Sequence, residues 1–202
     1  MPTFRDALAD INAIRAQIAR ATEFRGYGPA SVAATGVLAF LVAAVQAHWF
    51  KSSGQEWGTF LATWIATAVV CVILTGVETV TRAWRVHPGL ASEMIYHAAE
   101  QFCPALVAGF LLTLVFMRFV RGNLWMLPGL WQIVFSLGVF ASRRFLPWQV
   151  FLVGVWYLAT GLVCIAVTGA HGIPSPWAMG IPFGLGQLLV AAVLQFGYRE
   201  RV

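Results

Sequence analysis

Charged side chains are scarce in this sequence. Only 10% of its 202 residues are Asp, Glu, Lys or Arg, and 59% are hydrophobic, whereas soluble domains carry about 25% charged residues. So few charges cannot cover a water-exposed surface, which excludes an ordinary soluble domain. The nine Trp and fifteen Phe residues suit a surface that contacts lipid and the interface between lipid and water.

Residue patterns that carry chemistry are also missing. The cysteines Cys71, Cys103 and Cys164 make no CxxC pair and the four histidines make no HxxxH pair, so we expect free thiols and neither a metal nor a cofactor. No Ser/His/Asp set, paired carboxylates on one helix face or phosphate-binding glycine loop occurs, so we predict no catalytic residues. The net charge is +5, but the basic residues form no run, which argues against a nucleic-acid partner.

What the sequence does contain is six long apolar segments. A helix needs roughly 20 apolar residues to cross about 30 Å of hydrocarbon. The segments span residues 29–49, 57–79, 103–120, 124–141, 148–168 and 177–198. We therefore predict an all-α fold, a polytopic integral membrane protein in which residues 26–202 form a single domain of six transmembrane helices.

The distribution of Lys and Arg predicts the orientation of these spans. Cytoplasmic loops are enriched in basic residues. The side that holds both termini carries ten of them, and the opposite side carries only Lys51, Arg118 and Arg121. We therefore place both termini on the cytoplasmic side of the cell membrane. The ten are Arg5, Arg15, Arg20, Arg25, Arg82, Arg85, Arg143, Arg144, Arg199 and Arg201.

The region before the first span, residues 1–25, is predicted to be a cytoplasmic amphipathic helix. Its apolar side chains recur every three or four residues, with charged residues between them. Such a helix either lies flat among the lipid headgroups or docks on a partner. The apolar face consists of Leu8, Ile11, Ile14 and Ile18.

Stripes of small or polar residues follow most of the predicted spans. Lipid provides no hydrophobic drive between helices, so close packing and hydrogen bonds must hold them together. We interpret the stripes as the seams of a bundle in which consecutive helices are antiparallel neighbours. They are Thr63, Thr67, Cys71, Thr75 and Thr79; Ala105, Gly109 and Thr113; Gly129, Gln132 and Ser136; Gly154, Gly161, Cys164 and Thr168; and Gly180, Gly184, Gln187, Ala191 and Gln195.

Glu78 is the only acidic residue inside a predicted span. An ionisable group in a membrane is a functional hypothesis by default. However, Arg82 follows at the i+4 position, where an ion pair forms readily on a helix. We favour the structural ion pair and keep an ion or proton site as the alternative.

Uncharged polar residues inside the spans allow two interpretations. Thr67, Gln132, Gln187 and Gln195 either form hydrogen bonds between helices or line a polar interior of the bundle. We favour the hydrogen bonds.

Three classes of function remain after these exclusions. The favoured one is a non-catalytic accessory, assembly or regulatory subunit, which acts by association with other membrane subunits or with copies of itself. Residues 1–25 and the loop 80–102 would offer it a cytoplasmic contact surface. The alternative is a small transporter. An intramembrane enzyme is the least favoured, because no acid–base or nucleophile set is recognisable.

The transport alternative is supported by a resemblance to a known class of transporter subunit. The order of elements resembles that of an ABC-type permease subunit with six spans, in which an amphipathic helix and two spans precede a longer cytoplasmic loop and four further spans. The resemblance covers the whole chain as a layout, without a shared motif. It implies that the loop 80–102 couples to an ATPase. The short loop 169–176 departs from the layout, since such permeases usually place an extra hairpin before the last span.

The topology can be tested by cysteine labelling. We expect Ser53→Cys and Gly172→Cys to react with a membrane-impermeant thiol reagent added to intact cells, whereas Ser92→Cys and Ser142→Cys should not. Equal labelling of Ser92→Cys and Ser53→Cys would contradict the assigned orientation.

Overall fold

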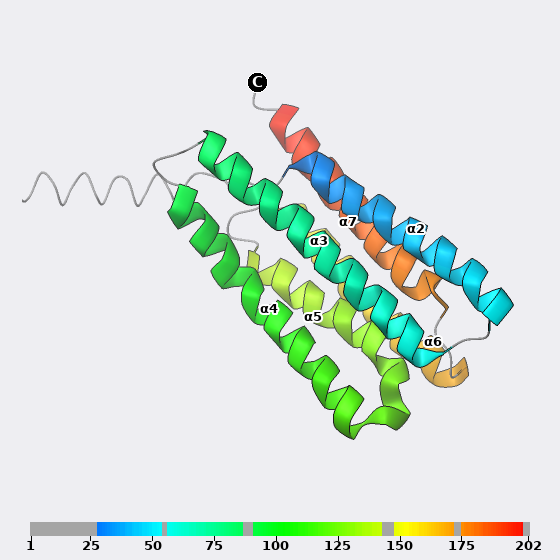
Figure 1. The fold of residues 1–202 in the computed structure, drawn as a ribbon. Coiled ribbons are helices and arrows are strands. Elements are labelled where there is room, and N and C mark those ends of the chain that lie inside the picture. Colours follow the sequence, from blue (N-terminus) through cyan, green and yellow to red (C-terminus); the bar gives the residue numbers. More distant parts are fainter. Residues whose placement is uncertain (1–27, 54–55, 87–90, 143–147, 172–174, 200–202) are drawn as a thin grey trace, which may run out of the picture.

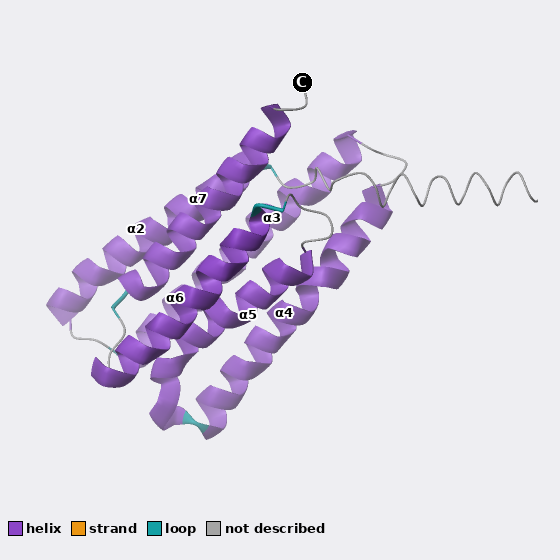
Figure 2. Cartoon of the chain, turned by 180° about the vertical axis from the view of Figure 1, so that it is seen from behind, coloured by secondary structure: helices purple, strands orange, loops and turns teal. Residues whose placement is uncertain are grey.

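The computed structural model describes residues 28–53, 56–86, 91–142, 148–171 and 175–199. Within these ranges the chain forms helices and no strand (Figures 1 and 2). The predicted amphipathic helix of residues 1–25 lies outside the described residues. The helices are α2 (Pro29–Ser53), α3 (Trp57–Val86), α4 (Ala91–Phe119), α5 (Leu127–Ala141), α6 (Val150–His171) and α7 (Trp177–Arg199), and the short 3-10 helix η1 (Arg121–Met126) precedes α5.

Six of the described segments are long and apolar enough to cross a membrane, which confirms the predicted all-α class and the number of candidate spans. These segments are Pro29–Trp49, Trp57–Arg85, Ala99–Phe119, Arg121–Ala141, Val150–Gly169 and Trp177–Phe196. Their long axes lie side by side as a bundle (Figure 1).

The structure differs from the sequence analysis at residues 80–102. This region was expected to be a loop, but α3 continues to Val86 and α4 begins at Ala91. Charged residues end an apolar segment without ending a helix, because Glu, Arg and Lys are themselves good helix formers. The two helices are therefore longer than their apolar parts.

Local signals in the sequence account for two helix starts. Pro128 lies in the first turn of α5, where its missing N–H would have no helical partner in any case. At the start of α7, the hydroxyl of Ser175 accepts a hydrogen bond from the backbone N–H of Trp177, at 3.3 Å. Such a hydroxyl satisfies one of the donors that a helix start leaves unpaired.

The most extensive helix pairing joins α2 to α7, the first and last described helices. Small residues let the two backbones approach closely. A Cβ on Gly36 of α2 would lie 2.9 Å from the carbonyl oxygen of Gly184, and a Cβ on Gly184 would overlap the ring of Phe40. Ala39 and Ala43 are buried on the same face of α2. The bundle is thus closed by helices that are far apart in the sequence rather than by consecutive neighbours alone.

A second close pairing joins α5 to α6. A Cβ on Gly129 would lie 2.6 Å from the carbonyl oxygen of Gly161, and a Cβ on Gly161 would lie 2.8 Å from the carbonyl oxygen of Gly129. The contact is reciprocal, so both glycines are needed for the helices to lie at this distance. The predicted seam residues of α5 and α6 are buried here, which confirms that part of the interpretation. They are Gly129, Gln132, Ser136, Gly154, Gly161, Cys164 and Thr168.

Helices α3 and α4 are much less covered by the rest of the bundle. In the candidate spans of α2, α5, α6 and α7, between 33% and 39% of residues are buried, compared with 22% in α3 and 6% in α4. The α4 helix packs mainly on α5, where Phe102 meets Phe135 edge to face at 5.3 Å. Most of its remaining surface is exposed and apolar.

Substitution of glycine by alanine at two positions should distinguish the effect of packing contacts on stability from the effect of helix propensity. We expect Gly129→Ala to lower the free energy of unfolding by about 1–3 kcal/mol, because the new methyl group would meet the Gly161 carbonyl. Gly76→Ala is the matched control. Nothing lies within 4 Å of a Cβ at Gly76, so this change should leave stability unchanged or raise it by up to about 1 kcal/mol.

Unfolding of the purified protein in mixed micelles, followed by circular dichroism against the mole fraction of denaturing detergent, measures both changes. A Gly129→Ala protein as stable as wild type would contradict the close contact of α5 and α6.

Candidate functional site

Indole and amide side chains link neighbouring helices through hydrogen bonds. Between α3 and α2, the indole N–H of Trp64 donates to Oε1 of Gln46 at 2.8 Å. Between α5 and α4, the indole N–H of Trp131 donates to the hydroxyl of Thr113 at 2.8 Å. Without water to compete, such bonds fix which helix faces meet. Buried polar groups are thus used here to hold the bundle together.

Pro182 creates a special case inside α7. Proline has no N–H, so the carbonyl of Ala178, four residues earlier, lacks its usual helical donor. The Gln132 side chain of α5 is 0% exposed, and its Nε2 donates to this carbonyl at 3.0 Å. On the other side, the indole N–H of Trp156 donates to the carbonyl of Pro182 at 3.1 Å. Gln132 therefore supplies the donor that Pro182 removes from α7, and Trp156 adds a further hydrogen bond to the same part of α7.

An aromatic cluster lies near the middle of the bundle, next to this proline. The ring of Tyr157 on α6 is 4.8 Å from that of Phe135 on α5 and 5.2 Å from that of Phe183 on α7. Tyr157 is 0% exposed. A Cβ on Gly186 would overlap its phenol ring, so this glycine makes room for the tyrosine.

The hydroxyl of Tyr157 is buried without a hydrogen bond of good geometry. It lies within electrostatic range of two other polar side chains, Gln187 of α7 and Cys71 of α3. Gln187 and Cys71 are both near the middle of their helices and both half-buried. The polar groups of Tyr157 on α6 and Gln187 on α7 therefore lie near each other at about half the height of the bundle.

The face of α3 that carries Cys71 is polar along three turns. Thr67 and Thr75 lie one turn to either side of Cys71, and they too are half-buried. Their hydroxyls donate to carbonyls of α3 itself, at 2.8 Å to Thr63 and at 2.7 Å to Cys71. Because these donors are already used, the hydroxyl oxygens can only accept further hydrogen bonds.

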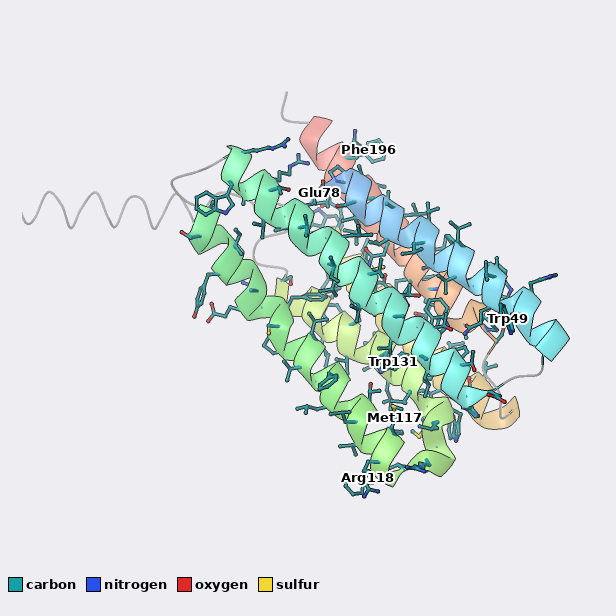
Figure 3. The ribbon with its side chains drawn as sticks, viewed as in Figure 1. Trp49, Glu78, Met117, Arg118, Trp131 and Phe196 are labelled. Carbon is teal, nitrogen blue, oxygen red and sulfur yellow. The ribbon has the colours of Figure 1, made fainter. Side chains whose placement is uncertain are left out.

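Glu78 lies at one end of the bundle, beside the start of α2 (Figure 3). It is half-buried, as is Arg82 one turn further along α3. Its carboxylate is directed at Gly28, where a Cβ would overlap Oε1. The start of a helix carries a partial positive charge that stabilises a carboxylate. This contact gives Glu78 a role in joining α3 to α2, which sequence spacing alone did not indicate.

The four uncharged residues proposed for the bundle interior have different environments. Gln132 is fully buried and bonds to α7. Thr67 and Gln187 are both half-buried, and only Gln187 lies near Tyr157. Gln195 is exposed on α7. In the part of the chain that the structure describes, no group of three or more His, Cys, Asp or Glu side chains is placed to hold a metal ion.

Two groups in this region were not singled out from the sequence. Tyr157 lies among many apolar and aromatic residues in its predicted span, so no local sequence pattern distinguishes it from them. Pro182 does have a signal, since a proline inside a predicted span leaves a carbonyl that needs a donor from another helix.

Comparisons of the chain with protein-family models, with curated proteins and with solved structures found no match.

The Gln132 bond can be tested with a double-mutant cycle. We expect Gln132→Leu to lower the free energy of unfolding by about 1–2 kcal/mol, because it leaves the Ala178 carbonyl unpaired. Pro182→Ala would provide a backbone N–H for that carbonyl. The cost of Gln132→Leu should therefore fall to less than half in the Pro182→Ala background, as measured by detergent unfolding of all four proteins. Equal costs in both backgrounds would show that Gln132 acts elsewhere.

Proposed function

We propose that this chain is an integral protein of the cell membrane with both termini in the cytoplasm, and that it acts by association as an accessory, assembly or regulatory subunit. Six helices of sufficient length and apolarity support insertion in the membrane. The excess of Arg on the side of the two termini supports the orientation.

The uneven burial of the helices is the observation that carries this proposal. Only 6% of the candidate span of α4 is buried, compared with 39% in α5. Helices in a membrane associate through van der Waals packing and hydrogen bonds, and α4 has little of either outside its contact with α5. Its outer surface is free to pack on a transmembrane helix of another subunit or of a second copy.

The use of the buried polar groups also favours association. Gln46, Thr113 and Gln132 each take part in a hydrogen bond between helices. The charged side chains of the described helices lie towards the helix ends, whereas carriers of charged substrates place charged groups near the middle of the bilayer. A role in helix contacts is the simpler explanation of this composition.

One observation favours the alternative, a small carrier. The buried hydroxyl of Tyr157 has no hydrogen bond of good geometry, and Gln187 lies near it at about half the height of the bundle, where many carriers bind their substrates. Such a carrier would transport an uncharged molecule, because the charged side chains of the described helices lie towards the helix ends.

Photo-crosslinking from the lipid-facing surface tests association. Phe110 on α4 is 63% exposed and Leu162 on α6 is 55% exposed, each near the middle of its candidate span. We expect a photoreactive phenylalanine analogue at Phe110 to yield a discrete protein adduct in native membranes, whereas the same analogue at Leu162 should react with lipid only. The adduct is resolved by electrophoresis and its second component is identified by peptide mass spectrometry.

The crosslinked partner can be a second copy of this chain or a different membrane protein, and both results are compatible with the proposal. The peptides identified by mass spectrometry distinguish the two. Reaction with lipid alone at both positions would contradict association through α4 and shift support to the carrier. A Phe110→Leu protein without the analogue serves as the control for expression and insertion.

A further inference from the structure

Two arginines lie together at the end of α4. Arg118 is in the last turn of the helix. Arg121 is the first residue of η1, and its side chain turns back so that Nε donates to the carbonyl of Met117 at 3.0 Å. Met117 and Arg118 are consecutive residues, and both lie at this end of α4 (Figure 3). The two guanidinium groups are therefore at the same end of one helix.

Neither guanidinium group has an acidic partner among the described residues. Arg118 and Arg121 are both exposed, and neither forms an ion pair within the part of the chain that the structure describes. The bond to Met117 uses only one of the five N–H groups of Arg121. Two positive charges with further hydrogen-bond donors can thus accept an anion that the described residues do not supply.

The surface next to these arginines is apolar and exposed. The ring of Phe119 is 78% exposed, and the guanidinium carbon of Arg118 lies over it, at 5.7 Å from the ring centre. Leu114 and Val115 precede Arg118 and Phe119 by one helical turn, so they lie on the same face of α4. They are 47% and 46% exposed. The guanidinium groups therefore border an apolar strip that continues along the helix.

The depth of the two arginines matches the headgroup region of a lipid bilayer. The candidate span of α4 runs from Ala99 to Phe119, and its 21 residues extend about 31 Å, close to the thickness of the hydrocarbon. Arg118 is thus in the last turn of the span, where the charged end of a long side chain can reach the lipid phosphates. An opposite charge bound at this depth stabilises the arginine.

We propose that Arg118 and Arg121 together bind the phosphate group of an anionic phospholipid. An acyl chain of this lipid lies along Leu114, Val115 and Phe119. Arginine suits phosphate because its planar group can form two parallel charge-assisted hydrogen bonds. A soluble phosphate would leave the apolar strip uncovered, whereas a phospholipid matches both the charge and the strip.

This inference rests on the proposed insertion in the membrane, but not on association through α4. Phe110, the position of the association crosslink, lies about two and a half turns before Phe119. The lipid site therefore leaves the middle of α4 available to a protein partner.

A photoreactive lipid tests the site. The full-length protein is reconstituted into phosphatidylcholine vesicles with a small fraction of phosphatidylglycerol that carries a diazirine near the start of one acyl chain. After illumination, lipid adducts are mapped by peptide mass spectrometry. The reference is the stretch 162–167 of α6, where Leu162, Val163 and Val167 are more than half exposed and no arginine occurs.

We expect the phosphatidylglycerol probe to label residues 114–119 several-fold more than a phosphatidylcholine probe with the same diazirine, because only the first carries a net negative charge. Both probes should label residues 162–167 equally. Equal labelling of residues 114–119 by the two probes would overturn the proposal. Excess glycerol phosphate should leave the labelling unchanged, and its loss would assign the arginines to a soluble phosphate and reject the lipid.

The arginines are tested by substitution. Arg118→Gln and Arg121→Gln should each lower phosphatidylglycerol labelling of residues 114–119 several-fold, and the double variant should lower it to the level of the phosphatidylcholine probe. Arg118 makes no hydrogen bond among the described residues, so Arg118→Gln removes no helix cap. Unchanged labelling in the double variant would overturn the proposal.

Arg85→Gln is the matched control. Arg85 is an exposed arginine in the last turn of α3, and the neighbouring Trp84 is 55% exposed. Because Arg85 is at the opposite end of the bundle, its substitution should leave the labelling of residues 114–119 unchanged. A decrease equal to that of Arg118→Gln would show that net charge alone attracts the lipid, and would overturn the site.

The lipid labelling and the Phe110 crosslink have separate outcomes. Arginine-dependent labelling of residues 114–119 without a Phe110 adduct would retain the lipid site and reject association. A Phe110 adduct without such labelling would do the reverse. Lipid adducts absent from the whole chain, including residues 162–167, would contradict insertion in the membrane itself.

Discussion

Close approach of helix backbones at small residues is the constraint on which the rest of this bundle depends. Gly129 and Gly161 bring α5 and α6 together, and Gly36 and Gly184 do the same for α2 and α7. Between helices that cross a membrane, burial of apolar surface provides no drive, so van der Waals contact at points of this kind supplies much of the attraction. Between these two close pairs, the buried amide of Gln132 on α5 reaches the backbone of α7.

Helix α7 depends most on that reach. Pro182 removes one backbone donor from its first half, and a buried carbonyl that is left unpaired is costly. Gln132 from α5 compensates by donating to the carbonyl of Ala178, and Trp156 from α6 adds a hydrogen bond to the carbonyl of Pro182. The proline therefore makes the hydrogen bonding of α7 depend on the correct placement of α5. This dependence favours one arrangement of the bundle over others with similar apolar contacts.

The parts of the fold that follow from local periodicity could be predicted from the sequence, and the parts that depend on pairing could not. Segment length predicted the six candidate spans, and the spacing of Gly129, Gln132 and Ser136 predicted a buried seam. No pattern predicted that α2 would pair with α7, because apolar helices carry little information about their partners. For the same reason the contact of Glu78 with Gly28 was missed, whereas the nearby Arg82 suggested an ion pair within α3.

Helix α3 is well packed only near its two ends. It is held at its ends, by Phe60 and Trp64 on one side and by Thr79 and Ala83 on the other, where these side chains are buried. Between them its residues are half-buried or exposed. A segment with few buried contacts opens at low free-energy cost, so we expect the middle of α3 to open more easily than α5 or α6, whose candidate spans are 39% and 33% buried compared with 22% for α3. Helix α4 is the least buried and contacts both α3 and α5, so a partner bound along α4 would cover the side of the bundle where the helices hold one another least.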